Sequence, residues 1–259
     1  MDNQTEHRIV NARPRRKPLV IVPTYNEVGN VENLFRQVSQ QMPAVHMLFV
    51  DDNSQDGTRD VIAQLQREAP ERVHMLPRAG KLGLGTAYIA GFKWALQRDY
   101  DAVVEMDADL SHRPVDLPRL VAKLADVDAA VGSRYTTGGG TENWNFGRKL
   151  ISRFGSLYAR TILGIPVNDL TGGFNAWSRE ILETVPLDDV KSEGYSFQIE
   201  LKFRAHLAGF KLAEVPIVFV ERRVGQSKMS SRIVVEAMFR VWALLGLRFQ
   251  PVKKRVPAA

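Results

Sequence analysis

Residues 19–52, LVIVPTYNEVGNVENLFRQVSQQMPAVHMLFVDD, contain two short apolar runs separated by an amphipathic segment. The runs are residues 19–22 and 47–50, and each is followed at once by polar or turn-forming residues. Residues 31–42 carry apolar side chains at helical spacing. Short apolar runs of this kind are typical of buried strands. The stretch therefore predicts a strand–helix–strand unit with two parallel strands.

The same alternation continues to residue 131. Further strands are expected at residues 72–76, 102–106 and 128–131, and further helices at residues 57–69, 86–98 and 114–125. This rhythm predicts an α/β fold with a mostly parallel, doubly wound, Rossmann-like sheet flanked by helices. Sheets of this class bind ligands at the carboxyl ends of their strands.

The rhythm changes after residue 134. The remaining expected elements are helices at residues 146–163, 196–208 and 233–249 and a strand at residues 212–220. The division that we expect is a flexible basic tail (1–17), one α/β domain (18–230), and a C-terminal amphipathic helix with a second basic tail (231–259).

Composition narrows the classes of protein. The chain has 259 residues, 44% of them hydrophobic, and a formal net charge of +6. That apolar fraction excludes a wholly disordered chain. There is no cysteine, which excludes disulfides, thiolate metal sites and cysteine nucleophiles. No apolar run approaches the roughly 20 residues of a membrane span, and residues 1–17 lack the apolar centre of a signal peptide. We expect a soluble or peripheral protein.

Acidic residues gather just after three of the predicted strands. They are Glu27, then Asp51, Asp52 and Asp56, and then Asp107 and Asp109. These strand ends share one edge of the sheet, where the carboxylates repel one another unless a cation joins them. Asp107 and Asp109 lie two apart, so on extended chain both face the same way. Such a pair suits Mg²⁺ or Mn²⁺, although an Asp-x-Asp sequence can also be a solvated turn.

Basic residues follow in the second half of the chain. They are Arg134, Arg148, Lys149, Arg153, Arg160, Arg222, Arg223 and Lys228. Because arginine binds phosphate oxygens in a bidentate manner, an acidic edge facing basic loops predicts two phosphorylated substrates. Other phosphate-binding and hydrolase motifs are missing. There is no P-loop and no Gly-x-Ser-x-Gly, and Tyr88 occupies the third small position of a would-be dinucleotide fingerprint that starts at Gly83.

Several short motifs occur in a defined order. They are Pro23-Thr24-Tyr25-Asn26-Glu27, Asp51-Asp52-Asn53-Ser54-x-Asp56-Gly57, Lys81-x-Gly83-x-Gly85, Asp107-Ala108-Asp109-Leu110-Ser111-His112, Gly132-Ser133-Arg134-Tyr135, Gly147-Arg148-Lys149, Asp169-Leu170-Thr171-Gly172-Gly173-Phe174, Gly194-Tyr195-Ser196-Phe197-Gln198 and residues 222–228. Together they resemble the family 2 glycosyltransferases of the GT-A fold. The later motifs narrow the resemblance to the polyprenol-phosphate (dolichol-phosphate) mannose synthases, over roughly residues 18–230.

The resemblance implies transfer of mannose from GDP-mannose to a polyprenyl phosphate, with inversion and with Mg²⁺ or Mn²⁺. It assigns guanosine contacts to Pro23, Tyr25, Glu27, Val50 and Asp52; metal, diphosphate and sugar contacts to Asp107, Ala108 and Asp109; sugar–phosphate contacts to Arg134, Gln198, Arg222 and Lys228; and the acceptor phosphate to Arg148 and Ser152. It places the metal on Asp107 and Asp109, and catalysis on Asp109, Arg134, Arg222 and Lys228. In some members a metal-ligating Gln stands at the position of Ser111, so water would fill that position here.

The acceptor chemistry sets what the residues must do. A phosphate monoester is already anionic at neutral pH, with a second pKa near 6. Such a nucleophile needs no general base, so we expect His112 to be structural. The harder tasks are positioning and the stabilisation of charge on the leaving diphosphate.

A lipid acceptor requires contact with a membrane. Apolar and aromatic residues interleave with basic ones around residues 146–163: Trp144, Phe146, Leu150, Ile151, Phe154, Leu157, Tyr158, Ile162 and Leu163. We expect most of these side chains to pack on the sheet. For residues 233–249 the alternatives are core, dimer contact and membrane contact, and we favour the membrane surface or a membrane anchor protein. The expected location is peripheral, on the cytoplasmic face of a membrane.

Other functions remain open at this point. A polyprenyl-phosphate glucosyltransferase that uses UDP-glucose or another nucleotide sugar would keep the fold and change the donor. A nucleic-acid-binding module would explain the basic tails. We expect no nucleic acid partner, because the most organised polar residues are acidic and no recognised motif is present. A decayed, non-catalytic scaffold is disfavoured by the intact acidic strand ends.

Overall fold

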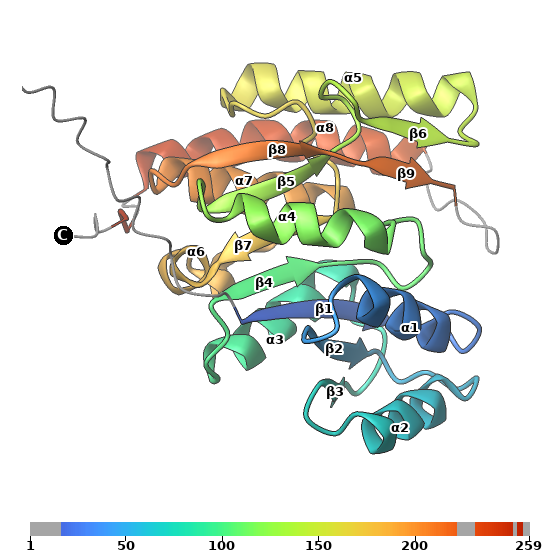
Figure 1. Ribbon diagram of the computed structural model, residues 1–259. Helices are drawn as coiled ribbons and strands as arrows, with labels where there is room; N and C mark the ends of the chain where they lie inside the picture. The colour runs from blue at the N-terminus through green and yellow to red at the C-terminus, as the bar shows by residue number, and fades with distance from the viewer. Residues whose placement is uncertain (1–16, 222–230, 251–252, 256–259) are drawn as a thin grey trace, which may run out of the picture.

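The computed structural model describes residues 17–221, 231–250 and 253–255, and for residues 231–237 only the backbone. The elements, drawn in Figure 1, are β1 (Pro18–Thr24), α1 (Val31–Gln41), β2 (His46–Asp51), α2 (Thr58–Glu68), β3 (Val73–Pro77), α3 (Leu84–Leu96), β4 (Ala102–Glu105), the 3₁₀ turn η1 (Pro114–Asp116), α4 (Leu117–Lys123), β5 (Ala129–Ser133), β6 (Gly140–Glu142), α5 (Phe146–Leu163), β7 (Asn175–Ser178), α6 (Arg179–Thr184), η2 (Leu187–Asp189), α7 (Gly194–Leu207), β8 (Leu212–Pro216), β9 (Val218–Val220), α8 (Ser231–Leu245) and η3 (Gly246–Phe249). The predicted alternation of strands and helices up to β5 is confirmed.

Seven strands form the central sheet in the order β3-β2-β1-β4-β7-β5-β8. All neighbouring pairs are parallel except the two that β7 makes with β4 and β5. The predicted mostly parallel sheet is confirmed, but β7 was not predicted, because its sequence NAWS is short and holds no apolar run. Its insertion leaves β4 and β5 parallel to each other. The carboxyl ends of β1, β2, β4 and β5 therefore lie at one edge of the sheet.

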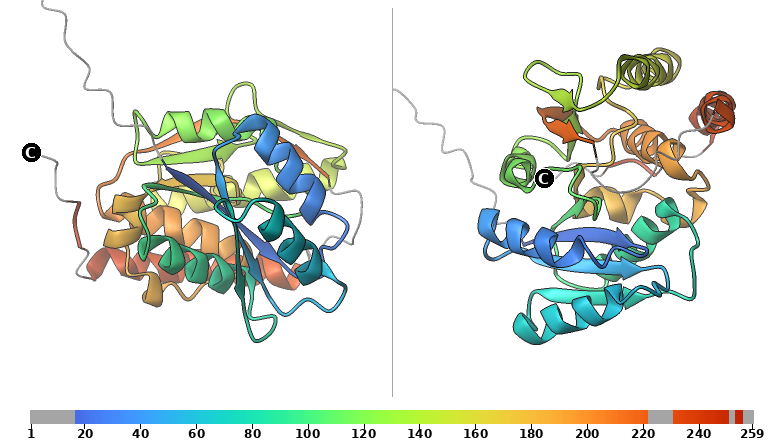
Figure 2. Two further views of the ribbon diagram at one scale, coloured as in Figure 1. Left: turned by 60° about the horizontal axis from the view of Figure 1, so that its bottom comes forward. Right: turned by 90° about the vertical axis from the view of Figure 1, so that its right-hand side faces the viewer.

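Side-chain alternation along β1 divides the core in two. Leu19 and Ile21 are buried in the cluster that includes α3, α5, α6, α7 and α8. Val20 and Val22 are buried in the cluster that includes α1, α2 and α4. Because successive side chains of a strand point to opposite faces, helices must cover both faces of this sheet. Figure 2 shows the resulting layers around the sheet.

Two predicted elements of the second half are divided in the structure. The strand expected at 212–220 breaks after Pro216, where a residue without an N–H cannot continue the ladder. β8 stays in the main sheet, while β9 pairs with β6 in a separate two-stranded sheet. The helix expected at 233–249 ends at Leu245 and is followed by η3.

The C-terminal helix α8 packs beside α5 and α7. The right-hand view of Figure 2 looks along α5 and α8, which lie next to each other. Val241 and Leu244 are buried in the same core cluster as Leu19 and Ile21 of β1. Residues 1–16 of the predicted basic tail lie outside the described residues. Part of the C-terminal tail is docked, since Arg255 pairs with Asp128 at 3.1 Å.

Candidate active site

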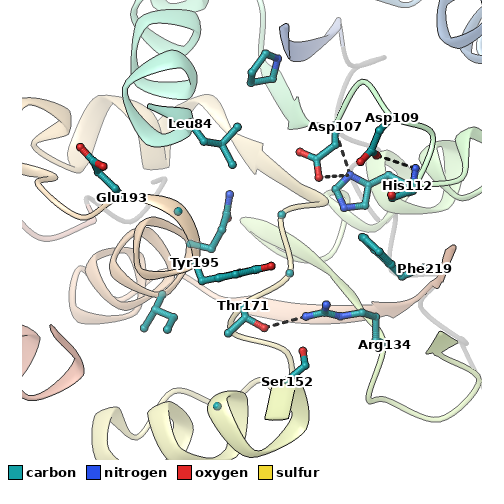
Figure 3. A pocket seen from close by; sticks show the side chains of 18 of the residues that line it. Leu84, Asp107, Asp109, His112, Arg134, Ser152, Thr171, Glu193, Tyr195 and Phe219 are labelled. Carbon is teal, nitrogen blue, oxygen red and sulfur yellow. Dashed lines mark hydrogen bonds and ion pairs between the residues drawn. The ribbon is translucent and has the colours of Figure 1, made fainter. Parts of the chain in front are cut away.

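A cavity of about 880 Å³ lies at the carboxyl edge of the sheet and extends between α5, α7 and α8. Most of the expected site residues line it: Pro23, Tyr25, Glu27, Asp52, Asp107, Ala108, Asp109, Arg134, Arg148, Ser152 and Gln198. The side chain of Val50 is fully buried in the core and is not among the lining residues. Arg222 and Lys228 lie outside the described residues. Figure 3 shows how Asp107 and Asp109 sit across the cavity from Ser152.

Asp107 and Asp109 are held in a turn. β4 ends at Glu105, and Leu110 has a left-handed backbone with φ 62°. Asp109 Oδ1 accepts the backbone N–H of Ser111 at 3.0 Å, which closes the turn. The predicted extended chain at these two residues is therefore wrong, because the strand ends at Glu105. Both side chains nevertheless line the cavity.

His112 is a structural neighbour of this turn. Its Nδ1 accepts the backbone N–H of Asp107 at 3.1 Å, and its buried ring stacks on Phe174 with centroids 5.0 Å apart. Nδ1 also lies 3.8 Å from Asp107 Oδ2. A nitrogen that accepts an N–H carries no proton of its own, so this contact is not an ion pair. The geometry supports the expected structural role of His112, which is to position the backbone of Asp107.

The carboxylates of Asp107 and Asp109 suit a divalent cation that takes its remaining ligands from water and a substrate. Within residues 17–221, 231–250 and 253–255, no three His, Asp or Glu side chains form a cluster able to hold a metal ion. Mg²⁺ typically takes one or two carboxylates and completes its shell with water and substrate phosphates. Asp107 and Asp109 on the wall of a cavity large enough for a nucleotide sugar match that pattern. Ser111 lines the cavity beside them.

The other carboxylates of this edge are already compensated. Asp51 is fully buried and pairs with Arg59, and it also accepts hydrogen bonds from Ser54. Asp52 lies 2.7 Å from Arg78 Nη1. Burial raises the pKa of Asp52, although the charge of Arg78 opposes this shift. Cations therefore do join these two carboxylates, as expected, but they are arginine side chains and not a metal ion.

Arg134 is engaged in a buried ion pair with Asp169. Its Nε and Nη2 donate to the two carboxylate oxygens at 2.7 Å each, and Nη2 also donates to Thr171 at 2.9 Å. Burial would lower the pKa of Arg134, but the charge of Asp169 outweighs it and raises that pKa. Burial would raise the pKa of Asp169, and Arg134 instead holds it below the ordinary value. The pair is close to neutral, so Arg134 brings little net charge to the cavity.

Gln198 belongs to a second buried polar cluster beneath the cavity. Its Nε2 donates to Glu105 at 3.0 Å, and its Oε1 accepts from Asn175 at 2.8 Å. Lys202 is completely buried and donates to the carbonyl of Gly172 at 2.7 Å. Burial raises the pKa of Glu105 and lowers that of Lys202. The cluster fixes the loop of Gly172 from below.

Several residues of this region had no predicted role in the site. They are Glu105, Tyr135, Asp169, Thr171, Asn175, Glu193, Tyr195 and Lys202. The motif at 169–174 marks Asp169 and Thr171, but nothing local shows that Asp169 reaches Arg134 across 35 positions of sequence.

One face of helix α5, the polar stripe, is polar and points toward the rest of the protein. Arg148, Ser152 and Ser156 follow at intervals of four residues, which places them on one face of a helix. Ser152 accepts a hydrogen bond from the hydroxyl of Tyr135 at 2.6 Å, and Ser156 lies 3.3 Å from Thr171. Arg148 pairs with Glu221 and stacks over Trp144 at 4.1 Å.

The opposite face of α5 is apolar and exposed. Five of the nine residues expected to pack on the sheet or beside it are exposed: Phe146, Leu150, Ile151, Phe154 and Leu157. The expectation that most of these side chains are buried is therefore wrong. On the neighbouring helix α8, Phe239 and Trp242 are exposed as well. Amphipathic helices normally bury their apolar face, so this reversed arrangement marks a surface for an apolar contact.

The sequence of the chain is similar to those of known glycosyltransferases. The sequence model described as "Glycosyl transferase family 2" matches residues 19–185. The chain is 47% identical to "Polyprenol monophosphomannose synthase" of Mycolicibacterium smegmatis, over 90% of this chain and 89% of that protein. It is 45% identical to "Undecaprenyl-phosphate mannosyltransferase" of Micrococcus luteus, over 92% of this chain and 98% of that protein.

Solved structures show the same fold. Glucosyl-3-phosphoglycerate synthase from Mycobacterium tuberculosis, in complex with Mn²⁺, UDP and glucosyl-3-phosphoglycerate, superimposes with a TM-score of 0.61. The similarity covers 90% of this chain and 80% of that one at 21% sequence identity. A second structure of that enzyme contains Mg²⁺ and UDP, also with a TM-score of 0.61 and at 20% identity.

Proposed function

The chain belongs to glycosyl transferase family 2, and from this membership we propose that it transfers mannose from GDP-mannose to a polyprenyl monophosphate. Mannose and a polyprenyl phosphate acceptor are supported by the names of the two relatives that share 45–47% of the sequence. The observation that carries the proposal is the course of the cavity. It runs from Asp107 and Asp109 to the polar stripe of α5, and it is also lined by Leu150 and Phe154 of the exposed apolar face. A phosphate with a long hydrocarbon chain is the acceptor that suits such a path.

The reaction that we propose needs no general base. An oxygen of the polyprenyl phosphate attacks the anomeric carbon of mannose, and the bond from that carbon to the diphosphate breaks with inversion. The bonding electrons leave with GDP. A fully ionised phosphate monoester has no proton to lose, so none has to be moved. His112 has its Nδ1 occupied by the N–H of Asp107, which agrees with a mechanism without an imidazole base.

Positioning and charge stabilisation are the tasks of the protein. Asp107 and Asp109 would hold Mg²⁺ or Mn²⁺, which when bound neutralises the charge that develops on a leaving diphosphate. Pro23, Tyr25, Glu27 and Asp52 would contact the guanosine. Arg222 and Lys228 are proposed to add positive charge near the diphosphate, a role that rests on the family resemblance. Arg134 is proposed to orient the sugar–phosphate region while Asp169 holds it in place.

Transfer of labelled mannose from GDP-mannose into organic-extractable lipid tests this function. The reaction contains a polyprenyl phosphate and Mg²⁺ or Mn²⁺, and a parallel reaction contains a chelator. Label in the lipid that disappears with the chelator is the expected result. Label from UDP-glucose but not from GDP-mannose would refute the proposed donor and favour the glucosyltransferase alternative.

We further propose that the apolar surface of α5 and α8 contacts the membrane in which the acceptor resides. None of the helices in the described part of the chain combines the length and apolar character that a membrane crossing requires. Lys149, Arg153 and Arg160 flank the exposed apolar residues on α5, which suits an anionic lipid surface. A peripheral location on the cytoplasmic face is part of this proposal. The alternative occupant is the membrane helix of an anchor protein.

Charge on this surface is expected to weaken lipid binding. Phe154→Asp places a carboxylate where an aromatic side chain is 57% exposed. Burial of a charge in the bilayer interface is unfavourable, so flotation of the purified protein with anionic liposomes should fall about ten-fold. Transfer to a short, water-soluble prenyl phosphate should fall much less than transfer to liposome-embedded acceptor. Gln64→Asp on the exposed side of α2 adds the same charge and serves as the control. Equal flotation of both variants would refute the membrane contact, and no flotation of the wild type would favour the anchor protein.

A further inference from the structure

We propose that Tyr135 is a positioning residue for the acceptor phosphate, because its hydroxyl holds Ser152 in the orientation that donates a hydrogen bond into the cavity. The inference rests on the proposed function and on the family resemblance, which assigns Ser152 to that phosphate. Tyr135 does not line the cavity, whereas Ser152 does. The hydroxyl of Tyr135 is linked to the cavity through its hydrogen bond to Ser152, while its ring lies beside Arg134, with the guanidinium carbon 5.2 Å from the ring centroid.

The geometry of the pair is specific. Tyr135 comes directly after Arg134 at the end of β5, and its backbone N–H donates to Ser133 Oγ at 3.2 Å. From there its side chain reaches α5, where the hydroxyl lies 2.6 Å from Ser152 Oγ. This is the normal length of a good O–H···O hydrogen bond. The bond joins the carboxyl end of β5 to helix α5, on which the proposed acceptor-binding residues lie.

The placement of protons gives the bond its direction. A serine hydroxyl has one proton and two lone pairs. Burial raises the pKa of Tyr135, so its hydroxyl keeps its proton. In the structure this hydroxyl donates to Ser152 Oγ at 2.6 Å. Ser152 makes no other hydrogen bond to the described residues, so its own proton is available for a ligand. Figure 3 shows the Ser152 hydroxyl directed toward Thr171 and Arg134, that is, into the cavity. A dianionic phosphate offers only acceptor oxygens and therefore matches a serine set as a donor.

The same hydrogen bond connects α5 to the segment that contains Arg134. Arg134 is bound to Asp169 and Thr171, and the next residue, Tyr135, is bound to α5. One helical turn beyond Ser152, Ser156 lies 3.3 Å from Thr171. The polar stripe of α5 is thus attached at two points to the residues that surround Arg134. Removing the Tyr135 hydroxyl would leave the second attachment intact, so the change should be local.

The test compares Tyr135→Phe with Tyr100→Phe in the full chain. Both changes remove one tyrosine hydroxyl. Tyr100, which precedes β4, lies at the opposite edge of the sheet, where its hydroxyl is hydrogen-bonded to His46. Tyr135→Phe should raise the KM for polyprenyl phosphate about ten-fold, with kcat within about two-fold and the KM for GDP-mannose unchanged. Tyr100→Phe should change none of these. A merely structural role of Tyr135 would raise both KM values or lower kcat, and either result would overturn the inference.

A double variant tests whether Tyr135 acts through Ser152. Ser152→Ala should raise the acceptor KM at least as much as Tyr135→Phe does. The double variant Tyr135→Phe/Ser152→Ala should have the same acceptor KM as Ser152→Ala alone. Once the Ser152 hydroxyl is gone, the Tyr135 hydroxyl has nothing to orient, so its removal has no further effect. Full additivity of the two effects would overturn the inference.

Binding measurements separate this inference from the proposed function. Calorimetry with a short, water-soluble prenyl phosphate requires no turnover and no GDP-mannose. Tyr135→Phe should weaken this binding about ten-fold and leave binding of the corresponding prenyl alcohol unchanged. If the wild type binds the phosphate in this way but transfers no mannose, the proposed function fails and the role of Tyr135 stands. If Tyr135→Phe binds the phosphate as the wild type does, the role of Tyr135 fails whatever the enzyme transfers.

Discussion

Replacing Asp109 by Asn is expected to lower kcat for mannose transfer at least about a thousand-fold, while the protein remains folded. Asp109 Oδ1 accepts the backbone N–H of Ser111, and an asparagine oxygen can accept the same bond. The turn between β4 and His112 should therefore persist. What is lost is one of the two carboxylates proposed to hold Mg²⁺ or Mn²⁺, and metal stabilisation of a leaving group is worth several kcal/mol. Each ~1.4 kcal/mol corresponds to a factor of ten in rate.

The measurement is kcat together with the metal concentration that gives half-maximal transfer. Asp109→Asn should raise that concentration as well as lower the rate. Asp126→Asn is the matched control, because Asp126 is exposed and pairs only with nearby Lys123 at 3.1 Å among the described ion pairs. Retention of more than about a tenth of kcat with an unchanged metal requirement would show that Asp109 is not a metal ligand.

Replacing Asp169 by Asn is expected to reduce the free energy of unfolding by about 3–5 kcal/mol, the usual cost of removing one partner from a buried ion pair. Both side chains of the Arg134–Asp169 pair are almost completely buried. Asparagine keeps an oxygen for the N–H of Gly172 but cannot offer two charged oxygens to the guanidinium. The arginine charge would then be buried without compensation. Transfer activity should fall as well. Asp169 holds the Arg134 guanidinium, which also donates to Thr171 on the wall of the cavity.

Chemical denaturation at neutral pH measures the change. Asp188→Asn, at an exposed position that pairs with Lys93, should leave the denaturation midpoint almost unchanged. An equal midpoint for Asp169→Asn and the wild type would contradict the assigned role of the pair. The pH dependence gives a second check. The pKa of Asp169 in the folded protein lies below its ordinary value of 3.8, so its stabilisation is complete above that value. It should be lost only as the pH falls from there through the lower, folded-state pKa.

Local sequence patterns were sufficient for much of the fold. The apolar runs of β1, β2 and β4 and the helical spacing of α1 and α2 were predicted to within a few residues, and the bounds of α5 were predicted as observed. These elements depend on side-chain periodicity and on turn residues, which neighbouring positions of the chain supply. The placement of Asp52, Asp107 and Arg134 at one edge also followed, because parallel strands end on the same side.

Pairings between distant segments were beyond the reach of such patterns. The Arg134–Asp169 ion pair, the Tyr135–Ser152 hydrogen bond and the compensation of Asp52 by Arg78 each join different elements. β7 is a short segment without an apolar run, so its sequence does not predict a strand. Its place between β4 and β5 depends on pairing with those two distant strands. A sequence shows which donors and acceptors exist, but only the folded chain shows which of them meet.

The two faces of α5 illustrate this division most clearly. The sequence by itself determined that residues 146–163 form a helix with one polar and one apolar face, because the 3.6-residue period fixes which side chains lie together. Only the tertiary structure decided which face points inward. Arg148 and Ser152 line the cavity, and Ser156 is buried. Phe154 and Leu157 are more than half exposed. The physical reason is that burial depends on which surface the neighbouring elements offer. Here that surface is the polar end of β5 and the loop of Thr171, which bind hydroxyls and leave the apolar face outside.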